Sequence, residues 1–137
     1  VILLIGPTGS GKSSFIRSLT KEKVEVNGQK PCTTECKDYL IELDINGRTK
    51  TFILVDTPGF EDFPENNLIA LRSIAEKLSK MRPQVVYGAI YFHRIINGRF
   101  HGTTRSILSI FKSICGDQFF DHVAFVTTMW DAINDGD

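Results

Sequence analysis

Apolar residues along this chain gather in short continuous runs that alternate with stretches of helical spacing. The runs that predict strands lie at residues 1–5, 39–45, 51–55, 85–92 and 123–126, and helical spacing covers 13–19, 68–81 and 107–114. Uninterrupted runs such as 1–5, 85–92 and 123–126 are typical of buried strands. Strands that alternate with helices predict an α/β fold with a mostly parallel sheet, and we expect 1–5 in its middle.

One pair of strands should break the parallel pattern. The segment 39–45 alternates in its second half, with Leu43 and Ile45 on its apolar side, which is typical of a half-exposed edge strand. Asn46-Gly47 follows and favours a type I′ turn, because that turn needs positive φ at both central residues. The strand 51–55 should therefore run antiparallel to its predecessor.

Two helices have further signals in the sequence. In the helix over 68–81 the expected buried face carries Leu68, Leu71, Ile74, Ala75, Leu78 and Met81. Gly116 comes directly after the third helix and is placed to act as its C-terminal cap. Both helices are therefore expected to cover the sheet.

The first strand leads into a glycine-rich phosphate-binding pattern. The run Gly6-Pro7-Thr8-Gly9-Ser10-Gly11-Lys12-Ser13 fits G-x-x-x-x-G-K-[ST] at every fixed position, with a strand before it and a helix after it. We expect these residues and Ser14 to bind a nucleotide, with Lys12 on the β- and γ-phosphates and Ser13 as a ligand of Mg²⁺. The alternative is a strand-to-helix turn that binds nothing.

A second cluster, Asp56-Thr57-Pro58-Gly59, follows the strand at 51–55. Asp56 can hold Mg²⁺ through water, and the unhindered Gly59 can offer its amide to a γ-phosphate. By itself this sequence would be read as a turn. Its spacing from the phosphate-binding pattern favours the functional interpretation.

The loop over 21–37 has little periodicity, and long loops inside compact domains tend to be functional. Thr33 or Thr34, with Thr34 favoured, is placed to close over Mg²⁺ and the γ-phosphate as a third metal ligand. A loop ordered by the γ-phosphate and released after hydrolysis would be a switch. The alternative is a solvated polar loop.

The last cluster, Thr128-Met129-Trp130-Asp131, resembles the guanine-reading [N/T]-K-x-D element of GTPases. By that resemblance Thr128 and Asp131 are nucleotide-binding residues, and the Asp131 carboxylate would select guanine. Met129 departs from the usual lysine, although its side chain can still lie along a base. The alternative for Met129 and Trp130 is packing at the sheet edge.

All three clusters follow predicted strands. In parallel α/β sheets, ligands bind beyond the carboxyl ends of the strands. The clusters at 6–13, 56–59 and 128–131 are therefore expected to form one site.

Taken in order, GPTGSGKSS, PCTTECKDY, DTPGFED and TTMWD resemble the septin-like branch of the P-loop GTPases, which includes GIMAP-type and Toc-type G domains. The run over 91–95 with VTTMWD is most similar to uncharacterised fungal G-domain proteins of that branch. The resemblance implies a three-layer Ras-like sheet, Mg²⁺-dependent binding of GTP and GDP and, for many members, nucleotide-dependent dimers or filaments. The expected partner is a second copy of this chain or a related G domain. It assigns Lys12, Thr34 and Gly59 to catalysis.

Two departures from that family affect the expected activity. Phe60 stands where Ras-type enzymes have a water-orienting glutamine, so we expect slow hydrolysis unless a group in trans assists. His93 and Arg94 are candidates for that group or for a dimer contact, and the alternative is an ordinary solvated loop. The chain also ends six residues after Asp131, so we expect a single G domain that lacks its last strand and helix.

Composition limits the partners. Lys and Arg number 16, as do Asp and Glu, so the formal net charge is zero and no nucleic-acid partner is expected. No apolar run approaches the roughly 20 residues of a membrane span. Cys32, Cys36 and Cys115 lack the partners of a zinc site, so we expect reduced thiols and a cytoplasmic protein.

Three functions follow as hypotheses. The first is a slow GTPase switch that acts through dimerisation. The second is a catalytically inactive scaffold that binds GTP or GDP as part of an interface. An ATP-using kinase is the weakest, because neither an acceptor site nor an arginine-rich lid is evident.

Overall fold

The computed structural model describes residues 1–20, 35–60, 64–81, 86–97 and 102–132. Its strands are β1 (Ile2–Ile5), β2 (Lys37–Ile45), β3 (Arg48–Asp56), β4 (Gly88–Arg94) and β5 (Val123–Thr128). Its α-helices are α1 (Lys12–Thr20), α2 (Pro64–Lys80) and α3 (Gly102–Cys115), and three short 3₁₀ helices are η1 (Ile95–Asn97), η2 (Asp117–His122) and η3 (Trp130–Ala132).

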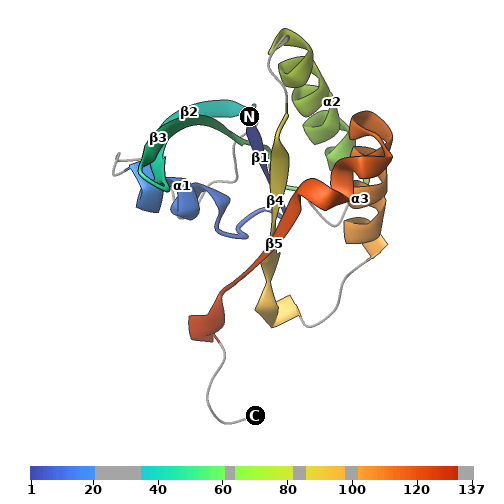
Figure 1. Ribbon diagram of the computed structural model, residues 1–137. Coiled ribbons are helices and arrows are strands. Elements are labelled where there is room, and N and C mark those ends of the chain that lie inside the picture. Colours follow the sequence, from blue (N-terminus) through green and yellow to red (C-terminus); the bar gives the residue numbers. More distant parts are fainter. Residues whose placement is uncertain (21–34, 61–63, 82–85, 98–101, 133–137) are drawn as a thin grey trace.

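The five strands form one sheet in the order β2-β3-β1-β4-β5. All neighbours run parallel except β2 and β3, which are antiparallel. Helix α1 covers one face, and α2 and α3 cover the other (Figure 1). The predicted α/β fold with one antiparallel edge strand is confirmed.

Strand β1 lies in the middle of the sheet, as predicted. Leu3, Leu4 and Ile5 are fully buried, because β3 and β4 flank the strand and helices cover both faces. The register pairs Leu4 with Asp56 on β3, and Ile5 with Tyr91 on β4. The carboxyl ends of these three strands therefore meet at one edge of the sheet.

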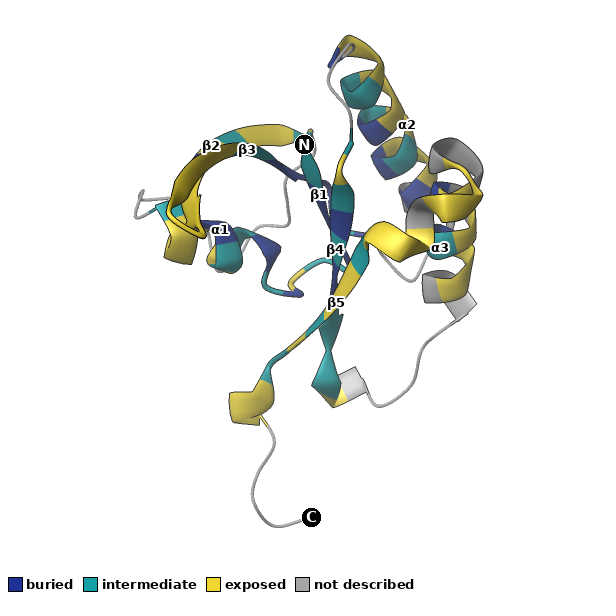
Figure 2. Ribbon diagram, viewed as in Figure 1, coloured by how far each residue is buried: buried dark blue, intermediate teal, exposed yellow. Residues whose placement is uncertain are grey.

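The predicted hairpin is confirmed. Asn46 (φ 54°) and Gly47 (φ 73°) both take the positive φ that a type I′ turn requires. The two strands are longer than predicted, and their tip extends past the other strands, so exposed residues line it (Figure 2). Leu43 and Ile45 were expected on a covered face, but they are 37% and 38% exposed because they lie in this projecting tip.

Two predicted strands need correction. Strand β4 begins at Gly88, where its pairing with Ile2 of β1 begins, and it extends to Arg94. Strand β5 is the outermost strand in the described part of the chain, and Phe125 is 52% exposed on it. The expectation of a strand buried on both faces is therefore wrong for β5, because burial depends on neighbours and not only on apolar character.

The rotation of α2 also differs from the expectation. Leu68 is 69% exposed and Ala75 is exposed, whereas Asn67 and Ala70 are buried. Apolar spacing alone did not decide which side of the helix meets the sheet. The cap predicted after α3 is confirmed, because Gly116 has a φ of 94° and its amide donates to Lys112 O at 2.8 Å.

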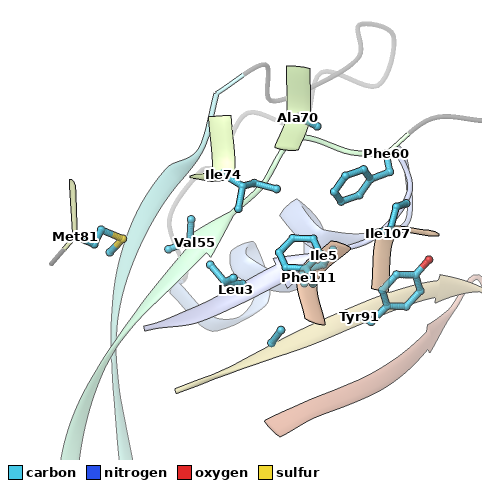
Figure 3. Close-up of a cluster of buried hydrophobic side chains, with 11 residues drawn as sticks. Leu3, Ile5, Val55, Phe60, Ala70, Ile74, Met81, Tyr91, Ile107 and Phe111 are labelled. Atoms are coloured by element: carbon cyan, nitrogen blue, oxygen red, sulfur yellow. The ribbon is translucent and has the colours of Figure 1, made fainter. Parts of the chain in front are cut away.

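The larger hydrophobic core lies between the sheet and helices α2 and α3 (Figure 3). It contains the fully buried Phe111 of α3 and Phe60, which follows β3. A second cluster on the α1 side contains Ile16, Ile41 and Phe92. Over the described ranges, no helix has the length and apolar character needed to cross a bilayer.

Candidate nucleotide-binding site

The loop between β1 and α1 curls tightly. Gly9 (φ 72°) and Gly11 (φ 93°) take left-handed conformations that other residues rarely adopt, and Ser10 N donates to Pro7 O at 3.1 Å. Helix α1 begins at Lys12, directly after this curl. The free backbone amides of its first turn therefore face the loop, and this arrangement attracts an anion.

Lys12 lies inside this curl. Its Nζ donates to Gly6 O at 2.9 Å and to Pro7 O at 3.0 Å, and the residue is only 6% exposed. The ammonium group is thus held by carbonyl dipoles at the mouth of α1, where the helix dipole adds further positive potential. Lys12 and the α1 terminus together make this loop suited to a polyphosphate.

Ser13 and Asp56 meet beside the loop. Ser13 Oγ, in the first turn of α1, donates to Asp56 Oδ2 at 2.9 Å, and Asp56 is 2% exposed at the end of β3. A hydroxyl and a carboxylate are hard oxygen ligands, and Mg²⁺ usually takes one or two of these from protein and others from phosphate and water. Within the described ranges, no group of three or more His, Cys, Asp or Glu side chains is arranged to hold a metal ion.

The segment after β3 lies against the phosphate-binding loop. Thr57 Oγ1 donates to Leu4 O at 2.7 Å, and Phe60 N donates to Gly6 O at 3.2 Å. The backbone of Gly59 is so close to Thr8 that a Cβ on Gly59 would lie 2.6 Å from Thr8 Cα. Gly59 is therefore next to the loop, as its proposed role requires.

Thr128 links β5 to the same loop. Its hydroxyl donates to Ser10 O at 2.9 Å and more weakly to His93 O at 3.4 Å. The side chain of Thr128 thus holds three chain segments together, which is a structural use that the motif alone did not indicate. This contact brings the end of β5 to the loop, as the sequence predicted for all three clusters.

The residues after Thr128 turn away from the strand. Met129 has a φ of 67°, which is unusual for a large side chain, and Trp130 Nε1 donates to Thr127 Oγ1 at 3.1 Å. Asp131 follows on η3 and is exposed. Its carboxylate is accessible to a ligand.

Two predicted site residues, His93 and Arg94, have another position than expected, and two others lie outside the described residues. His93 and Arg94 are half-buried in β4 and not in a solvated loop, because β4 extends to Arg94. Ser14 is exposed on α1. Thr33 and Thr34 fall outside the described ranges.

Contacts at the start of β2 were not predicted. Ser73 of α2 donates to Cys36 Sγ at 3.6 Å, and Lys77 of α2 forms an ion pair with Asp38. Burial raises the pKa of the Cys36 thiol above its ordinary value, although the Ser73 hydrogen bond acts the other way. Cys36 is a free thiol.

Comparison with known proteins agrees with this geometry. A family model described as "50S ribosome-binding GTPase" matches residues 1–87. The chain is 24% identical over 127 residues to GTP-binding protein A of Dictyostelium discoideum, covering 93% of this chain and 27% of that protein. It is 41% identical over 69 residues to Cell division control protein 11 of Encephalitozoon cuniculi, covering 49% of this chain and 24% of that protein.

Among solved structures, Toc33 from Arabidopsis thaliana in complex with Mg²⁺ and GMPPNP shares the fold. The TM-score is 0.72 at 21% identity, over 99% of this chain and 52% of that chain. The chain thus spans about a quarter to a half of the length of these relatives. With its phosphate-binding loop and its match to the family model, the chain belongs to the 50S ribosome-binding GTPase family and is a GTP-binding G domain of the P-loop GTPases.

Proposed function

We propose that this G domain is a Mg²⁺-dependent switch that hydrolyses GTP slowly and acts through nucleotide-dependent dimerisation. The observation that carries the proposal is the meeting of Ser13 and Asp56 at 2.9 Å beside the buried ammonium of Lys12. When bound, Mg²⁺ would neutralise charge on the phosphates. Ser13 and Asp56 would hold the ion, and Lys12 would bind the β- and γ-phosphates.

Within this proposal, base recognition falls to Thr128 and Asp131. Thr128 keeps the end of β5 against the loop through Ser10 O. The exposed carboxylate of Asp131 would accept hydrogen bonds from the N1–H and the amine of guanine, which adenine does not offer. A site built around such hydrogen bonds can reject the wrong ligand by a factor of about 10⁴.

The surroundings of Phe60 support the proposal of slow hydrolysis. The side chain is 2% exposed and packs in the core, so it cannot orient a water molecule for attack. Lys12, Gly59 and, from the loop outside the described residues, Thr34 would remain to stabilise the transferred phosphoryl group. A group supplied in trans can accelerate this reaction by about 10³–10⁵-fold.

Dimerisation is supported by the structural neighbour. A dimerization-deficient mutant of Toc33 has been solved, and dimerization has been described as important for the GTPase activity of Toc33. We propose that a second copy of this domain, or a related G domain, supplies the group in trans. His93 and Arg94, at the end of β4, remain candidates for it.

The alternative function is a catalytically inactive scaffold that binds GTP or GDP. The burial of Phe60 favours it, because an apolar ring packed in the core cannot orient the attacking water. Single-turnover release of phosphate, measured over a range of protein concentrations, separates the two. A rate that rises with concentration supports the switch, and the absence of release at every concentration supports the scaffold.

The first experiment is a competition assay. A fluorescent GDP analogue is displaced from the protein by GDP, ADP or XDP, with and without Mg²⁺. We expect GDP to compete at least about tenfold better than ADP, and Mg²⁺ to strengthen binding. Equal competition by ADP would contradict the assignment of Asp131, and failure to bind any nucleotide would contradict the proposed function.

Three further proposals concern context. We propose that residues 1–137 belong to a single G domain, that the protein acts in the cytoplasm, and that it is related to uncharacterised fungal G-domain proteins of the septin-like branch. Imaging of the tagged protein tests the location.

A further inference from the structure

The backbone of Phe60 pairs with the first residues of the phosphate-binding loop, on either side of Pro7. Phe60 N donates to Gly6 O at 3.2 Å, and Thr8 N donates to Phe60 O at 3.1 Å. The parallel pairing of β1 with β3 ends at Leu4 and Asp56 and resumes here as an isolated bridge between Pro7 and Phe60. The segment after Asp56 is therefore an extension of the sheet along the loop.

Helix α3, and not the phosphate-binding loop, holds the ring of Phe60. The ring lies edge-on to Phe111 of α3, with ring centroids 6.2 Å apart and planes at 87°. Both rings are in the core cluster, where Ile107 and Ala70 also lie near them (Figure 3). Edge-to-face pairs at this distance stabilise each other beyond the area that they bury. Helix α3 thus holds Phe60, although none of its described residues has been assigned to the nucleotide.

Gly59, which directly precedes Phe60, has no room for a side chain. A Cβ on Gly59 would lie 2.4 Å from Thr8 Oγ1 and 2.7 Å from Thr8 N. At the other end of the segment, Thr57 is fully buried and bonded to Leu4 O. The position of the Gly59 backbone therefore depends on Thr57 at one end and on the Phe60 ring at the other.

We propose that Phe60 is a positioning residue, whose packing against Phe111 sets the place of the Gly59 amide beside the phosphate-binding loop. This inference rests on the proposed function, in which Gly59 meets the γ-phosphate. GDP lacks that phosphate, so loosening this packing weakens binding of GTP more than binding of GDP. A ligand stabilises one of two conformations only to the extent that it binds that conformation more tightly than the other.

The test measures the affinities for GDP and for a non-hydrolysable GTP analogue, both with Mg²⁺, in Phe60→Ala and Phe111→Ala. We expect each variant to lower the ratio of GTP-analogue affinity to GDP affinity by about fivefold to tenfold, at the lower end of the usual coupling between sites. Phe60→Leu, which keeps most of the apolar volume, should restore the ratio. The ratio compares two ligands on one folded protein, so a general loss of stability does not change it.

Ile41→Ala is the matched control, because Ile41 is 6% exposed and lies in the other core cluster. It should lower stability and leave the ratio unchanged. If either alanine variant does not fold, Phe60→Val and Phe111→Val leave smaller cavities and replace them. An unchanged ratio in folded variants of both rings overturns the inference.

Hydrolysis gives a second readout. Phe60→Gln should not accelerate phosphate release, because residue 60 is directed into the core. Acceleration would mean that this residue can reach the attacking water, and would overturn the positioning role. If the wild-type protein binds neither nucleotide, the proposed function fails too; if it prefers the GTP analogue and the variants keep that preference, only this inference fails.

Discussion

Ser13 Oγ donates a 2.9 Å hydrogen bond to Asp56 Oδ2, although the two residues are 43 positions apart in the chain. The contact exists because α1 begins just beyond the end of β1, and β3 pairs with β1 so that Asp56 lies opposite Leu4. A hydrogen bond to a charged carboxylate contributes about 1.5–3 kcal/mol. Ser13 and Asp56 are therefore both structural partners and the expected magnesium ligands.

The first prediction concerns this pair. Ser13→Ala and Asp56→Asn should each weaken Mg²⁺-dependent nucleotide binding by about tenfold or more, because each removes one expected ligand of the ion. A loss of about 1.4 kcal/mol of binding free energy lowers the affinity tenfold. Titration of Mg²⁺ at fixed GDP measures the effect. Ser18→Ala is the control, because Ser18 is exposed on the same helix and bonds only to Phe15 O among the contacts described for it. Equal Mg²⁺ dependence in Ser13→Ala and Ser18→Ala would refute the assignment.

The second prediction concerns Lys12. Lys12→Ala should abolish nucleotide binding, because it removes the buried ammonium that Gly6 O and Pro7 O hold in the loop. Lys12→Arg should not restore binding, since a planar guanidinium does not fit a place built for a point charge. Calorimetry with GDP measures both variants. Arg17→Ala, exposed on α1, is the control, and retained binding in Lys12→Ala would contradict the prediction.

The third prediction concerns guanine. Asp131→Ala should reduce the preference for GDP over ADP, by up to a factor of about 10⁴ if the carboxylate alone decides the base. The competition assay measures the ratio. Asp117→Ala provides a control, because Asp117 is an exposed carboxylate that pairs with Lys112 at 3.3 Å. A preference for GDP that survives in Asp131→Ala would move base recognition to another residue.

The fourth prediction uses the raised pKa of Cys36. A thiol whose pKa is raised by folding binds its proton more tightly in the folded state. Its contribution to stability is complete below the unfolded pKa, near the ordinary value of 9.0, and is lost as the pH rises through the folded pKa. Unfolding by urea should therefore become easier from about pH 9 upward. Cys36→Ala should lose less stability over that range, and an identical pH profile would contradict the shift.

The fifth prediction concerns the ion pair between Lys77 of α2 and Asp38 of β2. Both side chains are partly exposed, at 26% and 39%, so solvent screens the pair. Lys77→Ala should cost no more than about 1 kcal/mol of unfolding free energy, and less at high salt. A double-mutant cycle with Asp38→Ala measures the coupling. A larger, salt-independent coupling would mean that the pair is more strongly shielded than its exposure implies.

Features that depend on a few neighbouring residues could be predicted from the sequence. Asn46-Gly47 gave the hairpin, because positive φ is a local property of these two residues. Gly116 gave the cap of α3 for the same reason. The phosphate-binding loop could be found because its glycines and Lys12 are fixed by backbone geometry and charge within eight residues. The alternation of strands and helices was enough for the fold class.

The tertiary structure alone decided which apolar residues are covered and which distant groups meet. Phe60 is buried because its ring packs against Phe111 of α3, whereas Phe125 is half-exposed because it lies on β5, the outermost strand of the described sheet. The hydroxyl of Thr128 reaches Ser10 O only because β4 and β5 pair in one register. Local conformation is set by the residues themselves, whereas burial and long-range hydrogen bonds are set by what the rest of the chain brings alongside them.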